Sequence, residues 1–131
     1  MTGLAFIRKD VFELIVKENH VYAEYSGIPA HMRTKTYAAV QIEEIVFDNL
    51  LVCESVKTYD AEIKLKVSIF GNPADDPQKL YEMADTMIID KYAKSGYSIK
   101  KVRIGNPNQN PKLGKMILEA EIILGARTSA V

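Results

Sequence analysis

Two neighbouring carboxylates in a proline-containing loop are the residues of this 131-residue chain whose types most suggest chemistry. Asp75 and Asp76 lie in the segment GNPADDP, which also carries the amide oxygen of Asn72. Such oxygens bind divalent cations, but three on one turn lack the ligand spacing of a known calcium loop. The segment has no glycine-rich cradle, and two negative charges repel phosphate. The sequence therefore favours neither a metal site nor a phosphate site here.

Side chains that could serve as a nucleophile or a general base are sparse. The chain has two histidines, His20 and His31, and a single cysteine, Cys53, which lies in an apolar run. Neither histidine belongs to a metal-binding or catalytic motif. Of the paired acids, only Glu119 and Glu121 share one face of an expected strand, and that face is the solvated one. We predict a non-enzymatic protein with no metal and no cofactor.

Length and composition indicate one domain covering residues 1–131. A chain of this length with 47% hydrophobic residues can close a single core. No apolar run approaches the roughly 20 residues of a membrane helix, and charged residues follow the short apolar N-terminus without a cleavage site. One cysteine allows no disulfide within the chain. We therefore expect a soluble, unprocessed protein in a reducing compartment, with no membrane partner.

The net charge is zero, but the two signs are separated along the chain. Residues 38–90 contain eleven acids and four bases, and residues 91–118 contain seven bases and no acid. The separation has two explanations: opposite surfaces for head-to-tail association of identical subunits or for a polyanion, or pairing of the signs between neighbouring strands of one molecule. Under the first explanation the candidate interface residues are Arg33, Lys35, Lys100, Lys101, Arg103, Lys112 and Lys115. No recognition helix accompanies them, so only non-specific contact with passing DNA is expected.

Hydrophobic periodicity predicts the elements up to the central strand. Apolar residues three and four apart predict a helix over residues 3–18. A short strand follows over residues 20–27, then a loop with Pro29, then a strand over residues 37–47 that stops at a turn signal, Asp48-Asn49, before a second strand over residues 50–56. Residues 59–69 alternate strictly between apolar and polar, which predicts a long strand of an antiparallel sheet with one covered and one wet face.

The segment GNPADDP then joins this strand to a helix. Asp76 is the expected N-cap and Pro77 the first helical residue, and Gly96 ends the helix. Its expected apolar stripe is Leu80, Met83, Ala84, Met87 and Ile88. A second segment, GNPNQNP at residues 105–111, is predicted to be the tip of a C-terminal hairpin, whose first strand has a possible β-bulge at Lys100 and Lys101. The repeat of the frame is interpreted as a coincidence of turn residues.

These elements predict an α+β fold: a mostly antiparallel sheet with an N-terminal helix and one helix packed on the sheet before a C-terminal hairpin. Four segments carry a resemblance to a known family: GLAFIRKDVFELIVKE, YAAVQIEEI, TYDAEIKLKVSIFGNPADDPQKLYEMADTMI and MILEAEIIL. In order and pattern, across nearly the full chain, they resemble the tail-terminator (tail-completion) proteins of long-tailed bacteriophages and related contractile particles.

The resemblance implies a structural virion protein with no catalytic residues. It implies a homo-oligomeric ring, usually of six subunits, that caps the tail tube, stops its polymerisation and offers a surface for joining the head. The implied partners are the tail tube protein, sheath and head-completion proteins, and the implied location is the virion tail, assembled in the host cytoplasm. Two alternatives stay open: another neck or tail connector, and a small α+β ligand-binding domain.

Overall fold

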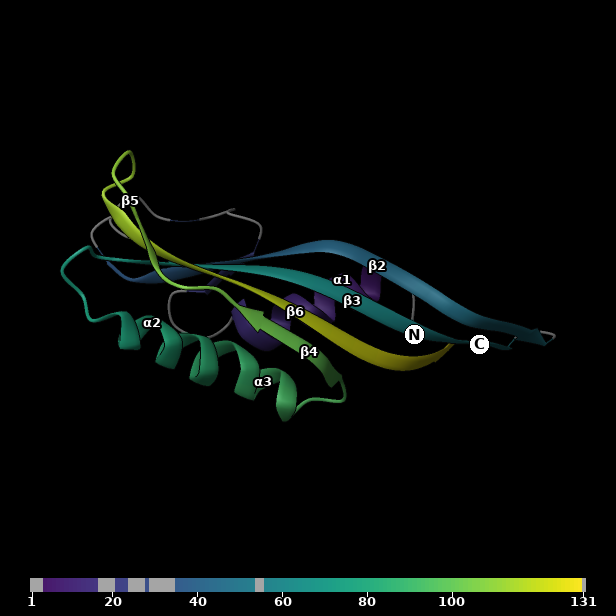
Figure 1. Cartoon of the computed structure of the whole chain (residues 1–131). Coiled ribbons are helices and arrows are strands. Elements are labelled where there is room, and N and C mark those ends of the chain that lie inside the picture. The colour runs from purple at the N-terminus through teal and green to yellow at the C-terminus, as the bar shows by residue number, and fades with distance from the viewer. Residues whose placement is uncertain (1–3, 17–20, 24–27, 29–34, 54–55, 131) are drawn as a thin grey trace.

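The computed structural model describes residues 4–16, 21–23, 28, 35–53 and 56–130 of the chain. Its elements in chain order are α1 (Leu4–Val16), β1 (Val21–Ala23), β2 (Tyr37–Cys53), β3 (Val56–Gly71), α2 (Pro77–Ala84), the π-helical turn η2 (Asp85–Ile89), α3 (Asp90–Ala93), β4 (Ser98–Ile104), β5 (Asn108–Asn110) and β6 (Lys115–Ala130). Figure 1 shows them as one sheet with helices against it.

The strands form a six-stranded sheet in the order β1-β2-β3-β6-β4, with β5 also paired to β6. All of the described strand pairs are antiparallel except β1–β2, which is parallel. The last strand of the chain, β6, therefore lies inside the sheet, between β3 on one side and β4 and β5 on the other. The predicted α+β class with a mostly antiparallel sheet is confirmed.

Strict alternation in β3 gives the sheet one dry face, which we call the inner face. Ala61, Ile63, Leu65, Val67 and Ile69 are each at most 2% exposed, as the alternation predicts. Their partners on β6 continue the same apolar face, with Leu118, Ile122 and Leu124 fully or almost fully buried. The opposite face, called the outer face, carries charged residues of both strands: Glu62, Lys64 and Lys66 of β3, and Glu119 and Glu121 of β6.

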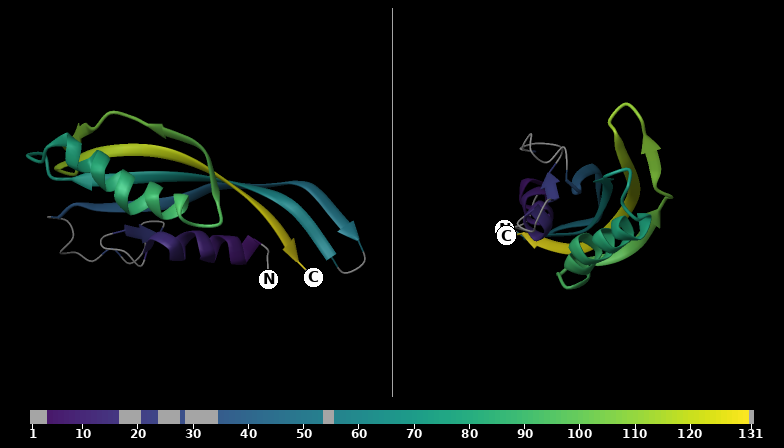
Figure 2. Two further views of the ribbon diagram at one scale, coloured as in Figure 1. Left: turned by 90° about the horizontal axis from the view of Figure 1, so that it is seen from below. Right: turned by 90° about the vertical axis from the view of Figure 1, so that its left-hand side faces the viewer.

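Both helical segments cover this inner face, and the left panel of Figure 2 shows them side by side. The first, α1, buries Ile7, Val11, Phe12 and Ile15 in the common core. The second runs from α2 through η2 to α3, and the buried Tyr92 hydroxyl donates a 3.0 Å hydrogen bond to the Val11 carbonyl of α1. The long strands β2 and β3 continue past the helices at one end.

The second helical segment contains a π-turn that the sequence did not indicate. Leu80, Met83 and Ala84 of the predicted stripe are buried, as is Ile88; the side chain of Met87 lies outside the described set. Beyond the turn the buried residue is Tyr92, four positions after Ile88, and the helix ends at Ala93, before Gly96. The wider turn keeps the segment facing the core over its whole length.

The predicted turn at Asp48-Asn49 is wrong, because β2 runs on from Tyr37 to Cys53. The register against β3 shifts between Asp48 and Leu51, so the two turn-type residues are absorbed in a strand irregularity. Asp and Asn mark turns through local hydrogen bonding, but here the long partner β3 offers continuous pairing on the far side of them.

The C-terminal hairpin also differs from the prediction. The segment GNPNQNP is not its tip: Asn108–Asn110 form β5 against β6, and the turn follows at residues 111–114, where Gly114 has φ 62°. The Gly105 N–H donates to the Glu119 carbonyl at 3.0 Å. This hydrogen bond holds the segment that connects β4 to β5 against β6. The β-bulge expected at Lys100 and Lys101 is confirmed by a register shift between Ile99 and Lys101.

Candidate interface on the edges of the sheet

Three of the predicted interface cations lie on β4, at one edge of the sheet. Lys100, Lys101 and Arg103 are all exposed. Lys101 and Arg103 stand in register with Ile123 and Glu121 of β6, on the outer face. The structure therefore brings this part of the predicted basic surface together.

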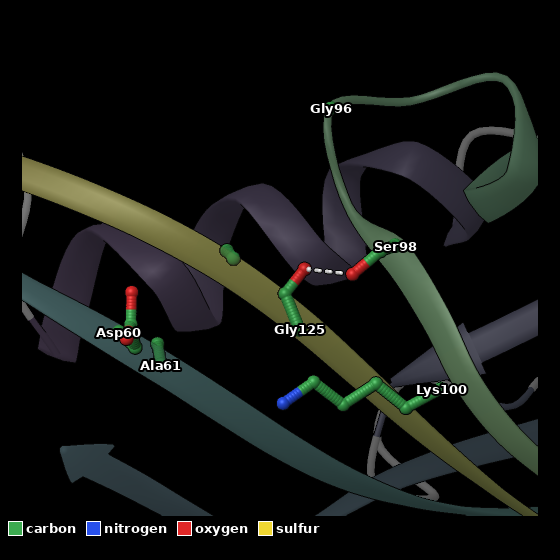
Figure 3. Close-up of a pocket in the computed structure, with 7 residues that line it drawn as sticks. Asp60, Ala61, Gly96, Ser98, Lys100 and Gly125 are labelled. Atoms are coloured by element: carbon green, nitrogen blue, oxygen red, sulfur yellow. Dashed lines mark hydrogen bonds between the residues drawn. The ribbon is translucent and has the colours of Figure 1, made fainter.

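Lys100 reaches from β4 across its neighbour to an acid on β3. Its Nζ lies 3.3 Å from the Glu62 carboxylate, and its chain passes over Gly125 of β6 (Figure 3). A Cβ on Gly125 would meet the Lys100 Cε at 2.5 Å, so the glycine leaves the room for the lysine. The adjoining hollow has a volume of about 270 Å³, and the Ser98 hydroxyl donates to the Gly125 carbonyl at 3.2 Å beside it.

Charges on the outer face are partly paired within the molecule. Lys64 of β3 lies 3.7 Å from Glu121 of β6 and 4.0 Å from Glu43 of β2. With the Lys100–Glu62 pair, these contacts support the second explanation of the charge pattern for the middle of the sheet. Exposed pairs of this kind contribute little to stability, about 0–1 kcal/mol each. The pairs take up Glu43 of β2 and Lys100 of β4, and the edge charges outside these pairs are Glu44 and Asp48 on β2 and Lys101 and Arg103 on β4.

Lys115 is not an exposed interface residue, and that prediction is wrong. The residue is 5% exposed, and its Nζ donates to the Lys35 carbonyl at 3.0 Å and to the Asn72 side-chain oxygen at 3.3 Å. The ammonium also lies 5.7 Å from the centre of the Tyr37 ring. Burial lowers the pKa of Lys115, and the nearby Asp75 carboxylate opposes that shift. Sequence reasoning could not separate this lysine from its exposed neighbours, because its partners are distant in the chain.

The other predicted cations are scattered. Lys112 is exposed in the turn between β5 and β6, and Lys35 is exposed just before β2. Arg33 lies outside the described residues. In the described part of the chain, the predicted cations therefore do not form one continuous row. Only the three on β4 lie together.

Both carboxylates of GNPADDP make structural hydrogen bonds at the junction between β3 and α2. Asp76 is the N-cap of α2 and accepts a 3.0 Å hydrogen bond from the Gln78 N–H, as predicted. Asp75 accepts from the Asn72 N–H at 3.1 Å and from the Thr36 hydroxyl at 3.2 Å, and Lys79 lies 3.8 Å away. Asp75 therefore contacts Asn72, Thr36 and Lys79, whereas the side chain of Asp76 caps the helix.

Asp75→Asn is expected to make the protein lose less stability as the pH is lowered into the acid range. The Asn72 N–H, with Thr36 and two lysines, holds the pKa of Asp75 below its ordinary value of 3.8, although burial opposes this. A depressed pKa stabilises the fold above the unfolded-state value, and that contribution disappears as the pH falls through the folded-state pKa. Thermal melts between pH 7 and pH 2 should therefore show a lower midpoint at pH 7 and a shallower acid decline for Asp75→Asn.

Asp76→Asn is the matched control, because Asn caps a helix about as well as Asp. Its melting curve should follow the wild type at each pH. Parallel acid declines in the wild type and Asp75→Asn would contradict the role given to Asp75.

The two long edges of the sheet carry opposite charge. The β2 strand contains Glu43, Glu44 and Asp48, all exposed, and no base. The β4 strand contains its three cations and no acid. The order β1-β2-β3-β6-β4 separates the two strands by the width of the sheet. Like charges along one edge repel another copy of the same edge, and unlike edges attract.

No group of three or more potential metal ligands occurs among the described residues. His20 and His31 lie outside them. None of the described helices has the length and apolar character to cross a bilayer. A second hollow, in addition to the one in Figure 3, has a volume of about 280 Å³ and is lined by Ile7, Leu14 and Tyr97. The Tyr97 hydroxyl donates a hydrogen bond to Asp10.

Comparison with known proteins identifies no relative: no family model matches the chain, and no curated protein matches it. The arrangement itself defines a class, an α+β protein with helices on one face and two oppositely charged sheet edges.

Proposed function

We propose that this chain is a structural protein of the tail-terminator type, which forms a ring on the end of a phage tail tube. The ring, of about six subunits in the family that the sequence resembles, would stop the tube from polymerising and offer a surface for joining the head. The order of the elements supports this proposal. A helix, two long strands, a capped helix and a returning strand follow one another along the chain, as in the family that the sequence resembles.

The observation that carries the proposal is the opposite charge of the two edges. Identical subunits that meet through two different surfaces associate head to tail, and they close into a ring when the rotation between neighbours allows it. The acidic β2 and the basic β4 are two such surfaces on one sheet. A chain that used one self-complementary patch would need both signs in that patch, giving a dimer instead of a ring.

Two exposed apolar residues support contacts with the tube and the head. Leu113 is 59% exposed in the turn before β6, and Phe47 is 38% exposed on β2. The exposed Asn108 and Gln109 of β5 add amide groups beside Leu113. These features suit docking to the tail tube protein at one face and to sheath or head-completion proteins at the other, with DNA passing the ring through non-specific contacts.

Phage particles made without this protein are expected to carry overlong tails or to leave heads and tails unjoined. The reason is that an uncapped tube keeps a surface on which further tube rings can add. Electron microscopy of lysates from a strain lacking the gene, with and without the gene supplied in trans, measures tail length and joining. Tails of normal length joined to heads would exclude the terminator function, and normal tails without heads would favour another neck connector.

A further inference from the structure

The two long edges are open over the same stretch of the sheet. On the β2 side, β1 pairs only with Ala38, Ala39 and Val40, so β2 has no described strand beyond it from Gln41 onward. On the other side, β4 pairs with β6 and has no further strand among the described residues. An open strand edge presents unpaired N–H and C=O groups that can pair with another chain.

The pairing registers place opposite charges at the two ends of one row. Lys101 is opposite Ile123, Ile123 is opposite Lys64, and Lys64 is opposite Glu44. The row crosses the outer face with a cation at the β4 edge and an acid at the β2 edge. The next row runs from Arg103 through Glu121 and Lys66 to Gln41, so the second cation faces a neutral amide at that level.

Strand direction favours pairing between these edges. Each of the pairs β2–β3, β3–β6 and β6–β4 is antiparallel, so β2 and β4 run in opposite directions. A second copy set beside the first in the same orientation therefore brings its β4 next to β2 as an antiparallel partner. Antiparallel pairing is the arrangement of every other long strand pair in this sheet.

We propose that copies of this chain join edge to edge, with β4 of one subunit paired antiparallel to residues 41–46 of β2 in the next and Lys101 opposite Glu44. This interface deepens the proposed ring function and rests on it. Each contact is between unlike edges, so the sheet continues from subunit to subunit, and its twist of roughly 20–25° per strand turns successive subunits about an axis.

Charge also excludes the wrong pairings. Two β4 edges would bring Lys100, Lys101 and Arg103 of both copies together, and two β2 edges would do the same with their acids. Like charges directly opposite on paired strands are destabilising. The edges therefore reject their own kind, as charged edge strands do in proteins that avoid aggregation, and they accept each other.

Charge reversal at the proposed contact is the first test. Lys101→Glu and Glu44→Lys should each weaken self-association of the purified protein at least tenfold, measured by sedimentation equilibrium over a range of protein concentrations. The double variant should recover most of the affinity, because every contact again joins opposite charges. Wild-type association should weaken as salt rises. Lys9→Glu and Glu13→Lys, exposed on α1 and outside both edge strands, are matched controls and should leave association unchanged.

A crosslink tests the register without relying on charge. In a chain carrying both Gln41→Cys and Arg103→Cys, oxidation should give a ladder of linked subunits on a denaturing, non-reducing gel. The register shift between Ile42 and Glu44 adds one residue to β2, so Arg103 faces Gln41 across the contact when Lys101 faces Glu44. Each single variant, and the wild type with its one cysteine, should give no ladder.

The outcomes separate this inference from the proposed function. Association that is unaffected by either reversal, a double variant that does not recover, no ladder from an oligomer, or a strictly monomeric wild type would each overturn the edge pairing. An oligomer insensitive to these changes leaves the ring proposal standing. Normal tails in particles lacking the protein, with the charge swap behaving as expected, would overturn the terminator function alone.

Discussion

Leu65→Ala is expected to lower the free energy of unfolding by roughly 2–5 kcal/mol, the range for a buried large-to-small change that leaves a cavity. Leu65 is fully buried at the centre of β3 and is paired with Ile42 of β2 and Ile122 of β6. Both helical segments pack on the same cluster, so the site has neighbours on every side and little freedom to collapse. Urea unfolding followed by circular dichroism gives the value.

Leu113→Ala is the matched control, because it removes the same atoms from a leucine that is 59% exposed. Its free energy of unfolding should stay within about 0.5 kcal/mol of the wild type, as expected for surface changes. A loss below about 0.5 kcal/mol in Leu65→Ala itself would show that β3 does not present this face to the core.

Lys115→Met is expected to cost about 1–3 kcal/mol, although the side chain keeps its length. The change removes the ammonium that bonds the Lys35 carbonyl and the Asn72 side chain, and leaves partly buried acceptors without a donor. Lys112→Met, in the neighbouring turn, is exposed and should be nearly neutral. Urea melts of both variants decide the matter. Equal stability of the two would mean that Lys115 does not tie the start of β6 to the segment before β2.

Local signals in the sequence were sufficient for the regular elements. The alternation around Leu65 predicted the buried face of β3, and Asp76 followed by Pro77 predicted the start of α2. The slip at Lys100 and Lys101 predicted a bulge. In each case the determinant lies within a few residues of the feature, so a pattern read along the chain can detect it.

The errors arise where distant segments decide the outcome. Asp48-Asn49 has turn chemistry, but pairing with β3 overrides it. The segment GNPNQNP looks like a hairpin tip, but β6 provides a partner for Asn108–Asn110. Lys115 looks like one cation of a basic run, but the acceptors that bury it come from Lys35 and Asn72. Likewise, the opposition of Lys101 and Glu44 across the sheet depends on three strand registers, none of which the sequence states.

The position of β6 inside the sheet has a consequence for how the chain acquires its structure. β2 and β3 are neighbours in sequence and can form a hairpin early, but β3 meets its other partner only through pairs such as Gly71 with Met116 and Lys57 with Ala130. Folding rates fall as contacts become less local, because loop closure must precede them. During synthesis β3 therefore lacks one of its two strand partners until residues 115–130 have left the ribosome. We expect this interval to limit the rate of folding and to expose the nascent protein to aggregation.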